Sequence, residues 1–179
     1  LGARLLLGDE RVVLRDQELR ADNQVVVFEL DQANAFARAR ELGLHCVAHA
    51  GEEGPPAYIW GALDVLQVER IDHGVQAIHD AALMKRLADS HMPLTVCPLS
   101  NLKLCVFKNL TDHNLPPLLD AGLCAMVNSD DPAYFGGYIN QNFVETFAAL
   151  PQLGARHAWQ LAANSFEASF VSAEVMACS

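Results

Sequence analysis

The sequence lacks the features that mark several broad classes of protein. No apolar run approaches the ~18 residues that suggest a membrane span, and the opening segment LGARLLLGDERVV reaches charged residues too early for a secretory leader. Basic residues are few, with 12 Lys and Arg against 22 Asp and Glu, and the formal net charge is −10. We therefore expect neither a membrane nor a nucleic acid as the partner.

Several catalytic and metal-binding signatures are also missing. The chain has no G-x-S-x-G elbow of a serine hydrolase, no Gly-rich phosphate fingerprint after its first predicted strand, and no C-x-x-C pair of a structural zinc site. The cysteines are odd in number and scattered through apolar segments: Cys46, Cys97, Cys105, Cys124 and Cys178. We expect reduced, mostly buried thiols in a cytoplasmic protein.

The composition is that of a folded protein. A hydrophobic content of 51% over 179 residues can bury a core, which excludes intrinsic disorder. We treat residues 1–179 as a single domain, or part of a larger one, in which residues 1–23 show no relation to the motifs below. The chain begins at Leu1 rather than at a methionine, which suggests a fragment.

Short apolar runs alternate with amphipathic stretches along the chain. The predicted strands cover residues 24–30, 44–48, 69–72, 94–98 and 124–127. The predicted helices cover residues 31–42 (with Asp31 as a cap), 58–68, 80–90, 115–121, 140–150 and 155–168. Alternation of this kind, without hairpin dipeptides, predicts a parallel sheet in an α/β fold.

Polar clusters stand at the carboxyl ends of successive predicted strands. The steps from His49 to His73, from His73 to Ser100 and from Ser100 to Asp130 are 24, 27 and 30 residues. One βα unit of a (β/α)₈ TIM barrel has roughly 30 residues, and such a barrel carries its active site at these strand ends. Because a full barrel needs roughly 200–250 residues, we expect an incomplete barrel of about five βα units.

Each cluster also has an ordinary structural explanation. His49 and Glu52 would be a hydrogen-bonded strand histidine and a solvated carboxylate, and the pair Asp130-Asp131 before a proline would be a helix-capping turn. His73 would be a buried histidine satisfied by the backbone. Three such clusters at three successive strand ends instead favour a metal-dependent hydrolytic site, for which zinc is the expected metal.

Two further groups of residues are less specific. The aromatic segment 134–138, which contains two glycines, predicts either ordinary packing or a wall for a flat ligand. The remaining histidines have no partner at a telling spacing, so we expect them at the surface: His79, His91, His113 and His157.

Four ordered motifs resemble the adenosine/adenine deaminase family, and within it the adenine deaminase branch. They are HAGEEGPP at 49–56, ERIDHGV at 69–75, PLTVCPLSN at 93–101 and NSDDPAYFGGYI at 128–139. The resemblance covers roughly residues 36–170. It implies a TIM-barrel zinc aminohydrolase of purine salvage that converts adenine and water into hypoxanthine and ammonia.

The resemblance also assigns roles to individual residues. It implies that His49 and Asp130 are zinc ligands and that Glu52 protonates the purine ring nitrogen beside the attacked carbon. His73 would orient the attacking hydroxide and stabilise developing charge. Asp131 would hydrogen-bond the imidazole side of the purine.

The sequence departs from the family pattern in its metal ligands. The family supplies two more zinc ligands from an H-x-H motif on its first strand, and this sequence contains no H-x-H. We therefore expect the C-terminal part of a deaminase barrel. The alternatives are an adenosine deaminase, or a truncated and inactive relative that binds a purine or a partner chain.

Overall fold

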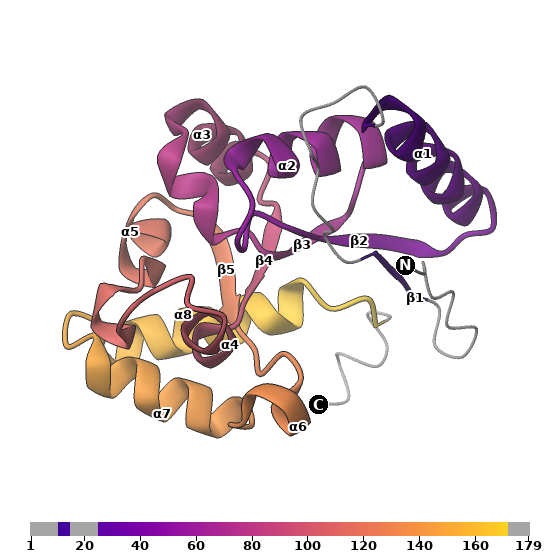
Figure 1. Cartoon of the computed structure of the whole chain (residues 1–179). Helices are drawn as coiled ribbons and strands as arrows, with labels where there is room; N and C mark the ends of the chain where they lie inside the picture. The colour runs from indigo at the N-terminus through magenta and orange to yellow at the C-terminus, as the bar shows by residue number, and fades with distance from the viewer. Residues whose placement is uncertain (1–10, 15–24, 172–179) are drawn as a thin grey trace.

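A computed structural model of the chain describes residues 11–14 and 25–171 and shows one sheet of five parallel strands (Figure 1). The strands lie in the order in which they occur in the sequence: β1 (Arg11–Leu14), β2 (His45–Ala50), β3 (Arg70–His73), β4 (Pro93–Val96) and β5 (Cys124–Val127). All four strand pairs are parallel. This sequential order is that of a barrel wall, because a doubly wound sheet reverses its strand order at a switch point. The predicted α/β partial barrel of five strands is confirmed.

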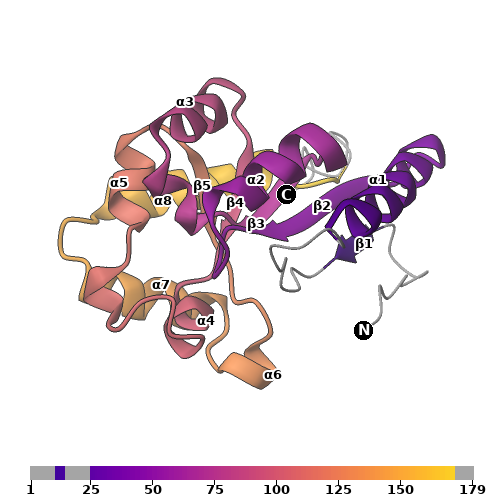
Figure 2. The same ribbon diagram turned by 45° about the horizontal axis from the view of Figure 1, so that its top comes forward.

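Helices connect the strands. The α-helices are α1 (Val25–Glu41), α2 (Pro56–Gly61), α3 (Ala81–Asp89), α4 (Pro98–Lys103), α5 (Leu115–Asp120), α6 (Pro132–Phe135), α7 (Ile139–Ala149) and α8 (Ala155–Glu167). A π-helical turn, η1 (Ala62–Leu66), and two 3₁₀ turns, η2 (Val75–His79) and η3 (Leu110–Asp112), complete the described elements. Two views place α1, α2 and α3 along one side of the sheet, and α4, α6 and α7 together beyond the ends of β4 and β5 (Figure 1 and Figure 2).

The first strand was predicted in the wrong place. Of the predicted strand 24–30, residues 25–30 are the first part of the 17-residue helix α1, and Asp31 lies inside this helix rather than at its start. The strand β1 instead lies at 11–14 and pairs with β2 from Arg11–His45 to Leu14–Ala48. A short valine-rich run has no period that separates helix from strand, and no Gly or Pro interrupts residues 25–41.

The core agrees with the predicted periodicity. Leu83 and Leu87, four residues apart on α3, are fully buried, and so are Ile71 and Leu94 on the neighbouring strands β3 and β4. All four residues of β5 are buried, which is typical of a strand covered on both faces. The apolar spacing in the sequence therefore located the core correctly from β3 onward.

The cysteines that the structure describes are mostly buried. Cys46, Cys97 and Cys124 are buried and Cys105 is exposed, and all four are free thiols, as predicted. Cys178 and most of residues 1–23 lie outside the described part of the chain. Among residues 11–14 and 25–171, no helix combines the length and the apolar character that crossing a bilayer requires.

Gly51 allows the chain to turn sharply after β2. Its φ is +67°, and a Cβ atom at this position would lie 2.4 Å from the Cδ1 atom of Ile59, which is fully buried in α2. Glycine is therefore required here both for the left-handed backbone and for the close approach of the helix. This turn brings the following residue, Glu52, back over the end of the sheet.

We expect Gly51→Ala to destabilise the fold more than Gly122→Ala does. Gly122 also has a positive φ, +79°, but a Cβ atom added there would have no neighbour within 4 Å. Gly122→Ala therefore carries the cost of the left-handed backbone without the clash with Ile59. The backbone cost is about 1–2 kcal/mol, and overpacking adds roughly 1–3 kcal/mol at Gly51. Urea unfolding of the two variants measures the difference, and equal losses would contradict it.

Candidate active site

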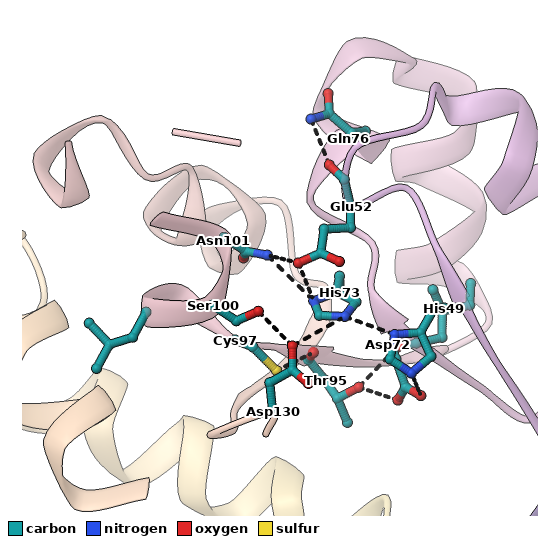
Figure 3. Close-up of polar contacts among 12 residues, drawn as sticks. His49, Glu52, Asp72, His73, Gln76, Thr95, Cys97, Ser100, Asn101 and Asp130 are labelled. Carbon is teal, nitrogen blue, oxygen red and sulfur yellow. Dashed lines mark hydrogen bonds and ion pairs between the residues drawn. The ribbon is translucent and has the colours of Figure 1, made fainter. Parts of the chain in front are cut away.

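Three strand ends bring the predicted site residues together. His49 lies in β2 and His73 ends β3, next to each other in a register that pairs Ala50 with His73. Asp130 follows β5, and Glu52 follows the turn after β2. Figure 3 shows the side chains of His49, Glu52, His73 and Asp130 converging on one point.

The ring of His73 is the centre of this group. Its side chain is almost fully buried, and its Nε2 atom lies 3.0 Å from Nδ1 of His49 and 4.0 Å from Oδ2 of Asp130. On the other edge of the ring, Nδ1 lies 3.2 Å from Oε1 of Glu52. Buried imidazole nitrogens need polar partners. His73 obtains them from the same residues that the sequence singled out.

Two of the site residues have left-handed backbones although neither is glycine. The φ of His73 is +70° and that of Asp130 is +57°. Such conformations cost on the order of 1–3 kcal/mol each and persist only where the surrounding structure enforces them. His73 is the last residue of β3 and Asp130 follows the end of β5, and these backbone conformations direct both side chains toward the shared centre.

Asp130 and Asp131 have different surroundings. Asp130 is largely buried, and its Oδ2 accepts a hydrogen bond of 2.5 Å from the hydroxyl of Ser100 on α4. Asp131 is exposed, and its Oδ1 accepts from the backbone N–H groups of Ala133 and Tyr134 at the start of α6. The structure therefore brings Asp130, but not Asp131, into the group around His73.

Glu52 is held by two residues to which the sequence analysis assigns no role: Asn101, which ends the third motif, and Gln76, which directly follows the second. Nδ2 of Asn101, on α4, donates to Oε1 of Glu52 over 2.7 Å. Nε2 of Gln76, on η2, donates to the main-chain carbonyl of Glu52 over 3.0 Å. The carboxyl group and the backbone of Glu52 are thus fixed separately, by different elements (Figure 3).

His49 has a carboxylate on its outer side. Its Nε2 lies 3.5 Å from Oδ2 of Asp72. The other oxygen of Asp72, Oδ1, accepts a hydrogen bond from the hydroxyl of Thr95, which pairs with Asp72 in the register of β3 and β4. Arg70 lies on the same strand as Asp72, with Nε 3.6 Å from Oδ1 of that carboxylate. A carboxylate behind a histidine is the usual support of a metal-binding imidazole, because it fixes the ring and its tautomer.

Cys97 is a site residue that the sequence analysis missed. Among the described residues, His73, Cys97 and Asp130 form a group whose ligand atoms all lie within 4.8 Å of one another, and this group does not include His49. Burial raises the pKa of the Cys97 thiol well above its usual value, and the charge of Asp130 raises it further. The structure thus brings a buried thiol beside the carboxyl group of Asp130.

His113 was also misjudged. The sequence placed it at the surface, where His79 and His91 do lie, but His113 is 3% exposed and its Nε2 is 3.3 Å from Oδ1 of Asn101. Its partner is twelve residues away on a different element. No local spacing indicates such a contact.

The aromatic segment after Asp131 is mostly exposed. Tyr134 is 81% and Tyr138 is 74% exposed, so they do not provide the ordinary core packing that was one of the two expectations. Gly137 lies so close to α4 that a Cβ would be 2.5 Å from Cδ1 of Leu99. Gly137 thus lets this segment approach α4 closely, and the wall for a flat ligand stays a prediction.

Comparisons with known proteins identify the family. The profile of the family described as adenosine deaminase matches residues 14–177. An adenine deaminase from Albidiferax ferrireducens is 73% identical over 139 residues, which cover 78% of this chain and 40% of that protein. A second, from Trichlorobacter lovleyi, is 66% identical over 145 residues, covering 81% of this chain and 42% of that protein. The chain thus spans about two-fifths of the length of these curated relatives.

Solved structures agree in fold. The crystal structure of an adenine deaminase from Arthrobacter aurescens aligns with a TM-score of 0.84 at 44% identity, covering 94% of this chain and 50% of that one. An amidohydrolase from Burkholderia ambifaria, solved with bound Zn, aligns with a TM-score of 0.77 at 23% identity, covering 93% of this chain and 45% of that one. Because the family profile matches nearly the whole chain, the protein belongs to the adenosine deaminase family.

Proposed function

We propose that this chain carries the acid–base half of a zinc-dependent site that deaminates adenine to hypoxanthine and ammonia, a reaction of purine salvage. The observation that carries the proposal is the buried ring of His73, which contacts Glu52 on one edge and faces His49 and Asp130 on the other. The relatives named adenine deaminase, at 73% and 66% identity, favour the free base over the nucleoside as substrate.

The residues fit a zinc ion in part. Nδ1 of His49 and Oδ2 of Asp130 both lie against Nε2 of His73, at 3.0 and 4.0 Å, so an imidazole and a carboxylate face one point. Catalytic zinc normally takes three protein ligands, and the sequence has no H-x-H. We propose that His49 and Asp130 complete a zinc site whose other ligands come from an H-x-H segment outside this chain. When bound, zinc would supply a strong acidification of a coordinated water, to a pKa near 7.

Glu52 and His73 would act as general acids and bases in the reaction. The water oxygen bonds to the carbon that carries the amino group while protonated Glu52 gives its proton to the adjacent ring nitrogen. The proton that the water loses passes by way of His73 to the amino group, and the carbon–nitrogen bond breaks to release ammonia. Glu52 regains a proton from the added hydroxyl as the carbonyl of hypoxanthine forms, so protons balance.

We propose that Asp131 binds the substrate rather than the metal. Its described hydrogen bonds to the N-terminus of α6 involve only Oδ1. The exposed carboxylate can therefore offer its second oxygen to an N–H group on the imidazole side of a purine. Its neighbour Asp130 turns the other way, toward Ser100.

Glu52→Gln tests the acid–base role. We expect it to lower the turnover of adenine by roughly 10²–10⁴-fold, since an amide cannot donate and regain the proton, while zinc content stays unchanged. The assay follows the loss of adenine absorbance with the chain combined with the part of the Albidiferax ferrireducens enzyme outside the matched 139 residues.

Glu53→Gln is the matched control, because Glu53 is adjacent but exposed. It should turn over adenine at the rate of the unaltered chain. Equal losses in the two variants would refute the role of Glu52, and turnover of adenosine but not adenine would refute the substrate.

The two adjacent aspartates provide a second test. Asp130→Asn should reduce the zinc content of the combined protein, because it removes a ligand charge, whereas Asp131→Asn should retain zinc and raise the KM for adenine. Metal analysis by mass spectrometry and steady-state kinetics separate the two effects. Loss of zinc in both variants, or in neither, would contradict the assignment.

A further inference from the structure

Asn101 can hold Glu52 only if its side-chain amide faces the right way. The residue is fully buried, with Nδ2 2.7 Å from Oε1 of Glu52 and 3.4 Å from Nδ1 of His73. If the amide were turned over, its carbonyl oxygen would face the carboxyl oxygen of Glu52 and the hydrogen bond would be lost. Something on the opposite side of the amide must therefore donate to Oδ1 of Asn101.

His113 provides that donor, and the backbone fixes its tautomer. The backbone N–H of Leu115, the first residue of α5, donates to Nδ1 of His113 over 3.1 Å. Because an N–H group can only donate, this nitrogen carries no proton, and a neutral ring then carries its proton on Nε2. Nε2 lies 3.3 Å from Oδ1 of Asn101 and donates to it.

The surroundings keep the His113 ring neutral and in place. Burial lowers the pKa of His113 to about 4, so the ring is uncharged at neutral pH. The ring of Phe107 packs against it, with 4.4 Å between ring centroids. A neutral ring has one accepting and one donating nitrogen, so the hydrogen bond from Leu115 determines which nitrogen donates to Asn101. A doubly protonated ring could not accept the hydrogen bond from Leu115.

We propose that His113 is a positioning residue for Glu52. It acts through Asn101. The backbone N–H of Leu115 donates to His113, His113 donates to the carbonyl oxygen of Asn101, and the NH₂ group of Asn101 donates to the carboxyl group. This inference rests on the proposed function, because it assigns Glu52 the role of proton donor. The partners described for His113 are Asn101, the backbone of Leu115 and the ring of Phe107.

The tautomer can be measured without any enzymatic activity. In the full chain labelled with ¹⁵N-histidine, long-range ¹H–¹⁵N spectra should show His113 with a protonated Nε2 and an unprotonated Nδ1. The side-chain NH₂ signals of Asn101 should shift in His113→Leu and return toward their original positions in His113→Gln, whose amide can donate from the place of Nε2. A proton on Nδ1 of His113 would overturn the proposal.

Kinetics then test the effect on Glu52. With the combined protein described above, His113→Leu should lower kcat by roughly 10- to 100-fold with little change in KM or zinc content, because misplacing a reacting group by about 1 Å can cost 10² in rate. His113→Gln should restore most of this loss. Unchanged kcat in His113→Leu, or no rescue by His113→Gln, would overturn the positioning role.

His157 provides a matched control, which separates the positioning effect of His113 from the effect of removing any histidine that accepts a backbone hydrogen bond. Nδ1 of His157 also accepts from a backbone N–H, that of Gly154, at 3.0 Å, but at the start of α8. His157→Leu should leave kcat unchanged. If the unaltered combined protein lacks adenine turnover, the proposed function fails while the tautomer of His113 is still decided by the spectra.

Discussion

The arrangement of the site depends on burying one imidazole ring, that of His73, with polar partners on both edges. An unpaired buried polar group costs several kcal/mol, so the neighbours of the ring must be brought to it by separate parts of the chain. Glu52 comes from the turn after β2, His49 from β2 itself and Asp130 from the end of β5. A sheet with parallel strands in sequence order meets this demand, because it gathers the carboxyl ends of all strands at one edge.

The sequence predicted most of this frame for identifiable reasons. From β2 onward, the strands follow short apolar runs and the longer helices follow apolar spacings near 3.6, while polar motifs mark strand ends at steps of 24, 27 and 30 residues. The short helices α4 and α6 were not predicted. The first predicted strand is helical instead. Residues 25–30 are apolar except for Glu29 and have no clear period, and they continue without Gly or Pro into a helix that ends at residue 41.

The supporting residues could not be predicted in the same way. Asn101 and His113 contact each other between a short helix and an irregular loop, and Asn101 reaches Glu52 across 49 residues of sequence. Such contacts have no period, and a buried histidine looks like a surface one when only its neighbours in sequence are known. The motif containing Asn101 was visible in the sequence, but the direction of its amide is set by a tautomer that only three-dimensional contacts define.

The adjacent aspartates show how the fold gives two identical side chains different chemistry. In an extended chain, consecutive side chains point to opposite sides, yet both would remain near the strand end. The left-handed φ of +57° at Asp130 instead turns the chain sharply, so that Asp130 faces the buried hydroxyl of Ser100. Asp131 is left outside, where it caps α6 and stays exposed. The backbone conformation of one residue therefore separates the pair into an inner carboxylate beside His73 and an exposed one that caps α6.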